Sequence, residues 1–143
     1  MKKYVAEVGS VWVGETTSAE SGNKIFTSTI TGAEVVAAVC KRGRTGSITP
    51  EDAAKALTAF KSEFRSSFTT INVSDQIIDH AMIVAERHGL RGYDSVQLAT
   101  AIKLQSRRDL IDLPPLTFVS ADDKLNAAAQ AEGLVVENPN NHP

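Results

Sequence analysis

Hydrophobic and polar positions along the chain follow two patterns, one with the period of a strand and one with the period of a helix. Short apolar runs bounded by turn residues predict strands at 24–28, 70–73, 116–120 and 134–137. Apolar residues recurring every three or four positions predict helices at 1–17 (with a break near Gly9), 30–42, 50–68, 75–88, from 94 onward, and 121–133. Strands that alternate with helices predict an α/β fold with a mostly parallel sheet.

Local sequence signals support several of these boundaries. Thr49 is a predicted N-cap, followed by Pro50 at the first helical position and by Asp52 at the spacing of a capping box. Ser74 is placed to cap the next helix, and Gly133 to end the last one.

Composition and charge narrow the functional class only modestly. The chain has 143 residues and a formal net charge of −2, which gives no general attraction to nucleic acids or membranes. We expect a single domain over 1–138 and a flexible tail over 139–143. The single cysteine, Cys40, and the absence of an apolar leader or membrane-length segment predict a cytoplasmic protein.

Asp94 occupies a position where helical spacing predicts an apolar residue. It shares a face with Leu98, Ala101 and Ile102, so its carboxylate is expected to face the core. A structural interpretation is also available, because an acid in the first turn of a helix is stabilised by the helix dipole.

Asp122 is predicted to face the core as well, since it aligns with Leu125 and Ala129. In the same segment Ser120 is the expected cap, with Asp123 completing a capping box and lying beside Asn126 on a solvated face.

Glu34 is the only charged residue in the run "ITGAEVVAAVC" and lies opposite a stripe of valines. Its spacing from Thr31 also fits a capping box, so a cap and a functional site are equally good interpretations of this residue.

Three acids in the first turns of three helices indicate a common site more strongly than any one of them does. Like charges in a dry cleft destabilise the fold unless a cation lies among them. Mg²⁺ or Mn²⁺ with oxygen ligands is the expected partner, and such a site can hydrolyse a phosphodiester.

Three segments carry a resemblance to a known family. "ITGAEVVAAV", "RGYDSVQLATA" and "VSADDKLNAAAQAEGL" look like successive motifs of PIN-domain proteins, particularly the VapC-like toxins of type II toxin–antitoxin pairs. The resemblance implies an α/β/α sandwich and an Mg²⁺- or Mn²⁺-dependent endoribonuclease that acts on RNA. It places Glu34, Asp94 and Asp122 as catalytic, metal-binding acids, and it implies a cognate antitoxin and a homodimer.

The chain departs from this pattern at its beginning. The family opens with a central apolar strand that ends in a first metal-binding aspartate, whereas "MKKYVAEVGS" resembles the helix that follows that strand. We therefore expect an N-terminally truncated chain with three of four acids and a weakened metal site. One alternative is a catalytically inactive PIN-like module that binds antitoxin or RNA without cleavage, and another is a fold whose carboxylates only cap helices.

Overall fold

The computed structural model describes residues 1–142 and has a mixed α/β architecture. The chain divides into two compact units, each described here by itself. The N-terminal unit consists of Met1–Ile71 together with His142, and the C-terminal unit consists of Asn72–Asn141.

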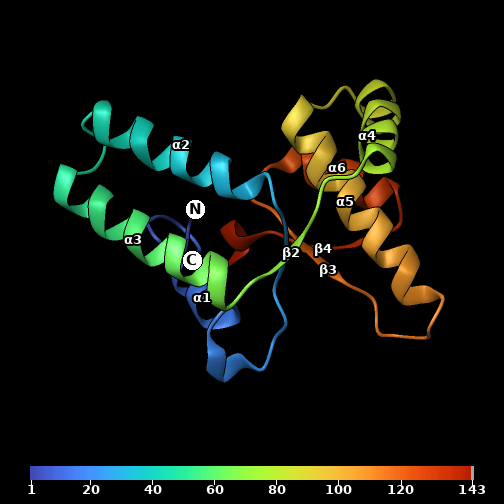
Figure 1. The fold of residues 1–143 in the computed structure, drawn as a ribbon, viewed down its shortest axis with the longest axis horizontal. Helices are drawn as coiled ribbons and strands as arrows, with labels where there is room; N and C mark the ends of the chain where they lie inside the picture. The colour runs from blue at the N-terminus through green and yellow to red at the C-terminus, as the bar shows by residue number, and fades with distance from the viewer. Residues whose placement is uncertain (143) are drawn as a thin grey trace. The chain divides into compact units, whose positions relative to one another are not determined.

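The N-terminal unit contains two short parallel strands and two long packed helices (Figure 1). Its elements are α1 (Ser10–Thr16), the 3₁₀ helix η1 (Ala19–Ser21), β1 (Phe26–Ser28), α2 (Thr31–Arg44), α3 (Pro50–Ser66) and β2 (Thr69–Ile71). β1 pairs in parallel with β2, with Phe26 opposite Thr69. The core of this unit is formed where α2 packs on α3, around the buried residues Val35, Val39, Ala56 and Phe60.

The predicted start of α3 is confirmed. The hydroxyl of Thr49 accepts a hydrogen bond from the Asp52 N–H at 3.1 Å and donates one to the Asp52 carboxylate at 2.7 Å. Pro50 lies at the first helical position, where its missing N–H leaves no hydrogen bond unmade.

The prediction of a helix from Met1 is wrong, because helical structure begins only at Ser10. Gly9 has a φ of 81°, a left-handed conformation that a right-handed helix cannot include. The Ser10 hydroxyl accepts a hydrogen bond from the Glu7 N–H and donates one to the Val5 carbonyl, so it stabilises the turn before the helix.

The C-terminal unit repeats the same plan with different helices. Its elements are α4 (Asp75–His88), α5 (Gly92–Asp109), β3 (Thr117–Val119), α6 (Asp123–Ala131), β4 (Val135–Glu137) and the 3₁₀ helix η2 (Pro139–Asn141). β3 pairs in parallel with β4, with Thr117 opposite Val135. Val84, Leu98 and Ala129 are fully buried at the centre, one from each of α4, α5 and α6.

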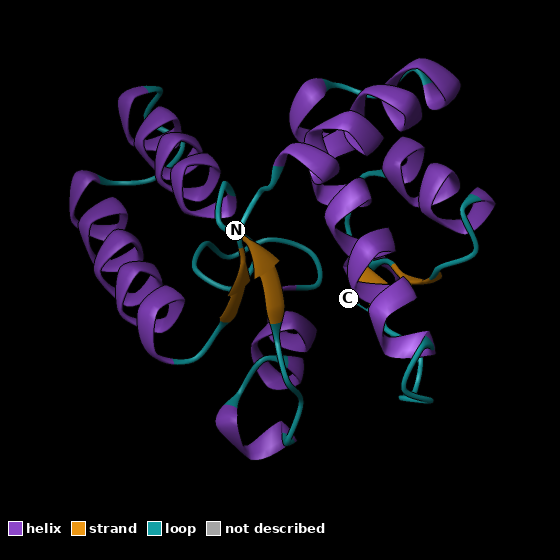
Figure 2. Ribbon diagram, turned by 45° about the vertical axis from the view of Figure 1, so that its right-hand side comes forward, coloured by secondary structure: helices purple, strands orange, loops and turns teal. Residues whose placement is uncertain are grey.

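The α/β prediction is confirmed, and both strand pairs are parallel, as expected (Figure 2). Helices alternating with short parallel strands are consistent with the α/β/α architecture that the resemblance implies. Each strand has three residues and is shorter than its apolar run predicts. Within residues 1–142, no helix combines the length and the hydrophobicity that a membrane crossing requires.

Candidate metal and active site

Asp94 lies in the first turn of α5 and is partly buried. The helix begins at Gly92, and its N-cap, Arg91, makes no side-chain capping hydrogen bond. The same helix carries the fully buried Leu98 one turn further on. Asp94 was predicted to face the core, and its partial burial agrees with this only in part.

Asp122 has a different position from the one predicted. It is exposed, and it is the N-cap of α6, where its Oδ1 accepts a hydrogen bond from the Leu125 N–H at 2.9 Å. Its backbone is extended rather than helical, so the helical phase that predicted a core-facing side chain does not apply to it. Ser120, the expected cap, instead accepts a hydrogen bond from the Asp122 N–H at 3.1 Å.

The two aspartates interact electrostatically. Burial raises the pKa of the Asp94 carboxyl, the negative charge of Asp122 raises it further, and the Arg91 guanidinium opposes both effects. Asp122 is therefore near enough for its charge to act on Asp94, and the two acids lie at the beginnings of α5 and α6 of the same unit.

Glu34 belongs to the N-terminal unit, in the first turn of α2, and is partly buried. The N-cap of α2 is Ile30, which has no side-chain oxygen, and Thr31 is already helical. The predicted capping role of Thr31 is therefore wrong, because Thr31 lies one position inside the helix. The role of Glu34 as a third site acid stays a prediction.

Asn126 is a residue that the sequence analysis placed incorrectly. It is buried, with 7% of its surface exposed, although it was expected on a solvated face of α6. Its side-chain nitrogen, Nδ2, donates a hydrogen bond to the Ser120 carbonyl at 2.9 Å, whereas its Oδ1 has no hydrogen-bond partner in the described part of the chain. A buried polar atom in this state costs about 1–3 kcal/mol. The sequence offered one indication of its burial, because Asn126 is a single amide flanked by the apolar residues Leu125 and Ala127–Ala129.

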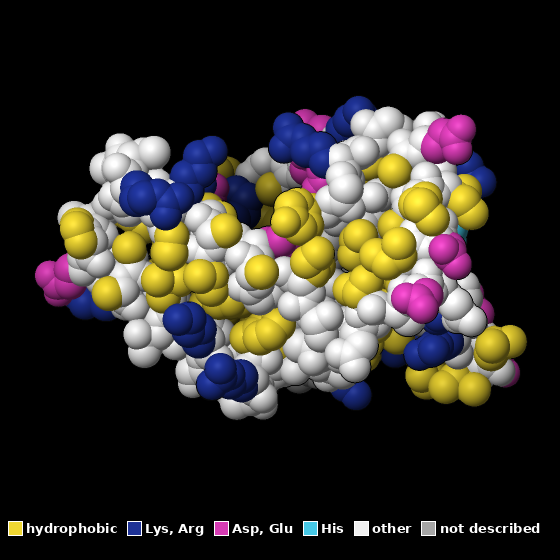
Figure 3. All heavy atoms as spheres, turned by 45° about the horizontal axis from the view of Figure 1, so that its top comes forward, with side chains coloured by type: hydrophobic (Ala, Val, Ile, Leu, Met, Phe, Trp, Pro, Cys, Tyr) yellow, Lys and Arg dark blue, Asp and Glu magenta, His cyan; other side chains and the backbone are white. Residues whose placement is uncertain are grey.

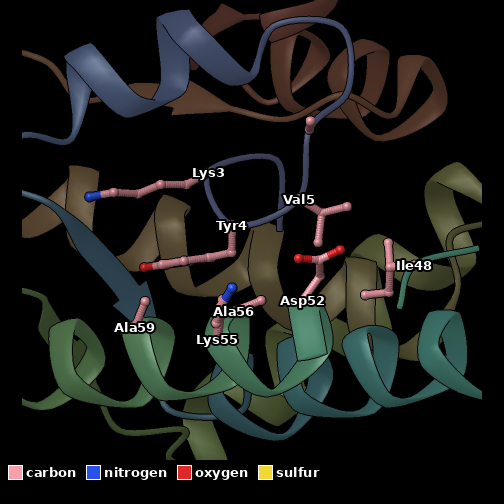
Figure 4. Close-up of a pocket in the computed structure, with 9 residues that line it drawn as sticks. Lys3, Tyr4, Val5, Ile48, Asp52, Lys55, Ala56 and Ala59 are labelled. Carbon is pink, nitrogen blue, oxygen red and sulfur yellow. The ribbon is translucent and has the colours of Figure 1, made fainter. Parts of the chain in front are cut away.

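A cavity of about 570 Å³ lies elsewhere, in the N-terminal unit (Figure 4). It lies between the segment Lys3–Ala6 and α3, and Asp52 and Lys55 are among the residues that line it. None of the three predicted acids lines it. Its lysines are already paired, Lys3 with Glu63 at 3.0 Å and Lys55 with Glu51 at 2.7 Å.

Hydrophobic side chains also reach the surface, among charged ones (Figure 3). Ile78, Met82 and Ile83 are exposed on α4. Leu110, Ile111 and Leu113 are exposed in the segment that follows α5.

Comparison with known families gives one match, to the PIN domain family, over residues 10–131. The chain belongs to the PIN domain family. The matched span includes all three predicted acids, and membership indicates a nuclease-type function, with RNA as the substrate suggested. No curated protein matches the chain.

PIN domains are in general nucleases that depend on divalent metal ions, and the donor set of this PIN domain fits such an ion. Asp94 and Asp122 offer hard carboxylate oxygens, and Mg²⁺ is commonly bound through one or two carboxylates with water completing its shell. Among residues 1–142, no group of three or more His, Cys, Asp or Glu side chains is arranged to hold a metal ion. The assignment of Asp94, Asp122 and Glu34 as metal ligands stays a prediction.

Proposed function

We propose that this protein is a metal-dependent endoribonuclease of the VapC-like toxin type, which hydrolyses phosphodiester bonds in RNA. The observation that carries the proposal is the match to the PIN domain family over residues 10–131. Within that span, Asp94 and Asp122 lie at the beginnings of α5 and α6, and the charge of Asp122 acts on Asp94. Two carboxylates held together in this way favour a divalent cation.

In this proposal Asp94 and Asp122 are ligands of Mg²⁺ or Mn²⁺, and Glu34 is assigned as a metal-binding acid through its match to the family motif. When bound, the ion would lower the pKa of a water molecule and neutralise negative charge on the phosphate. The Leu125 N–H, which donates to Asp122 Oδ1 at 2.9 Å, would help to hold this carboxylate in place for the cation. Arg91, which acts electrostatically on Asp94, would attract the phosphate backbone of RNA to the same place.

The proposed partners follow from the toxin type. A cognate antitoxin would bind the protein and cover the acids, and two copies would form a homodimer in the cytoplasm. The exposed Ile78, Met82 and Ile83 of α4 support an apolar interface of this kind.

A second candidate is a PIN-like module that binds antitoxin or RNA but does not cleave. It is favoured because, among residues 1–142, no group of three or more His, Cys, Asp or Glu side chains is arranged to hold a metal ion. Fewer carboxylates would hold the cation more weakly and would position the attacking water less well.

One experiment separates the two candidates. Purified protein is incubated with a mixture of structured and single-stranded RNAs and Mn²⁺, beside the Asp94→Asn variant and a sample in excess chelator. The nuclease proposal predicts cleavage by the wild type alone. Cleavage that persists in chelator would refute the metal mechanism. RNA or antitoxin binding with no cleavage above that of Asp94→Asn would establish the second candidate.

A further inference from the structure

We infer that Asn126 is a positioning residue for Asp122, and this inference rests on the proposed function. Asn126 is one turn along α6 from Asp122 and is buried beneath the loop that carries it. In the described part of the chain, its side chain makes no hydrogen bond to the Asp122 carboxylate. It acts through the backbone of Ser120.

Ser120 is held at three points where the chain leaves β3. Its N–H donates to the Glu137 carbonyl at 3.2 Å, its carbonyl accepts from Asn126 Nδ2 at 2.9 Å, and its hydroxyl accepts from the Asp122 N–H at 3.1 Å. The Asn126 amide is the one contact of the three that comes from the core side of α6. Without it, the Ser120 carbonyl would have to turn toward another donor, and the two residues that lead to Asp122 would turn with it.

The backbone of α6 completes the arrangement. The Asn126 N–H donates to the Asp122 carbonyl at 2.9 Å, and the Leu125 N–H donates to Asp122 Oδ1 at the same distance. Asp122 is therefore fixed at its N–H, its carbonyl and one carboxylate oxygen. Asn126 contributes to both ends of the loop, through its side chain to Ser120 and through its backbone to Asp122.

The unpaired Oδ1 of Asn126 supports a positional role over a purely structural one. Leucine has the same branched shape and the same number of heavy atoms, and it would leave no polar atom without a partner. An amide at this position is unfavourable for burial and is useful only for the hydrogen bond that it donates. Sites where a local rule is broken in this way tend to be functional.

The test compares Asn126→Leu with Thr100→Val. Both changes remove a buried polar side chain of the C-terminal unit, but the Thr100 hydroxyl bonds only to the Val96 carbonyl of its own helix. Three quantities are measured for each: the midpoint of thermal unfolding without metal, the Mn²⁺ dissociation constant by calorimetry without RNA, and kcat and KM for RNA cleavage.

We expect Asn126→Leu to bind Mn²⁺ about 10- to 100-fold more weakly than Thr100→Val and to lose a similar factor in kcat. KM for RNA should stay unchanged, because Asn126 does not touch the substrate. The Leu125 amide resonance should also shift in Asn126→Leu, since that N–H reports on the cap that Asp122 makes.

A folded Asn126→Leu variant with the Mn²⁺ affinity and kcat of Thr100→Val would overturn the inference while the proposed function stands. A wild-type protein that neither binds Mn²⁺ nor cleaves RNA would overturn both. If Asn126→Leu does not fold, Ser120→Ala decides, because it removes the hydroxyl that accepts from the Asp122 N–H and should weaken Mn²⁺ binding in the same direction. Unchanged Mn²⁺ binding by Ser120→Ala would then refute the positional role.

Discussion

Asp122 has two separable roles in this structure, a helix cap and a proposed metal ligand, and two substitutions distinguish them. Asp122→Asn keeps a side-chain oxygen that can accept from the Leu125 N–H but removes the negative charge. Asp122→Ala removes both. Asparagine and aspartate are about equally good N-caps, whereas replacing a good cap by alanine costs about 0.5–2 kcal/mol.

The expected stabilities follow from the contacts of Asp122. Asp122→Asn loses the interaction of a charge with the helix dipole, about 0.3–1 kcal/mol, and gains from the removal of repulsion with Asp94, so it should unfold close to the wild type. Asp122→Ala also loses the 2.9 Å bond to the Leu125 N–H and should be less stable than Asp122→Asn by about 1 kcal/mol. In a domain of this size, that difference lowers the unfolding midpoint by about 3 °C.

Urea unfolding and Mn²⁺-dependent RNA cleavage are measured on both variants. Thr49→Ala serves as the control, since it removes an equivalent cap from α3, a helix that carries none of the three acids. We expect Thr49→Ala to lose about 1 kcal/mol of stability and to keep its cleavage rate. Both Asp122 variants should lose cleavage. Wild-type cleavage by Asp122→Asn would show that the carboxylate only caps the helix.

Three further predictions concern stability. Folding raises the pKa of Asp94, so the ionised carboxylate destabilises the folded protein above that pKa. Asp94→Asn should therefore have a higher melting temperature than the wild type at pH 7. The difference in melting temperature should vanish below the ordinary aspartate pKa of about 3.9. Hydrogen bonds from His88 and Arg87 lower the pKa of Glu132. The ionised Glu132 therefore stabilises the fold above the ordinary glutamate pKa, and this stabilisation is lost as the pH falls through the lowered pKa. Glu132→Gln should be less stable than the wild type at pH 7 but not in acid, and a stability difference that does not change with pH would contradict this. Gly89→Ala should lose about 1 kcal/mol in urea unfolding, because Gly89 ends α4 with a φ of 62°; an unchanged midpoint would show that the turn tolerates a side chain.

Local signals in the sequence predicted the helix boundaries that depend on a single side chain. Thr49 and Ser74 cap α3 and α4 as expected, since each hydroxyl lies at the spacing needed to reach an N–H inside its helix. The α/β class was predicted from segments of strand-like and helix-like hydrophobic periodicity that alternate along the chain. This prediction does not depend on the exact boundaries of each segment. Strand ends were less predictable, because an apolar run shows burial and not the extent of hydrogen-bonded pairing.

The errors at Asp122 and Asn126 have two different causes. The apolar phase was counted as if residues 121 and 122 were helical, whereas α6 begins at Asp123. Each residue in a helix rotates the side chain by about 100°, so a helical phase assigned to a residue outside the helix has no meaning. Asp122 was therefore predicted to face the core, whereas the structure shows it exposed. Asn126 was predicted on the solvated face of α6, whereas the structure shows it buried, because packing against neighbouring elements decides where the apolar face of a helix ends.

The unfavourable features of the C-terminal unit are concentrated around this loop. Asp94 is partly buried and repelled by a like charge, and Asn126 contains a buried oxygen with no partner in the described part of the chain. Elsewhere, charged groups such as Glu132 and Glu63 lie in ion pairs that stabilise the fold. Selection for stability alone would remove a repelled acid or an unsatisfied amide through a single substitution, to asparagine or to leucine. Their concentration at the beginnings of α5 and α6 is the pattern expected when a site keeps destabilising groups because its chemistry requires them.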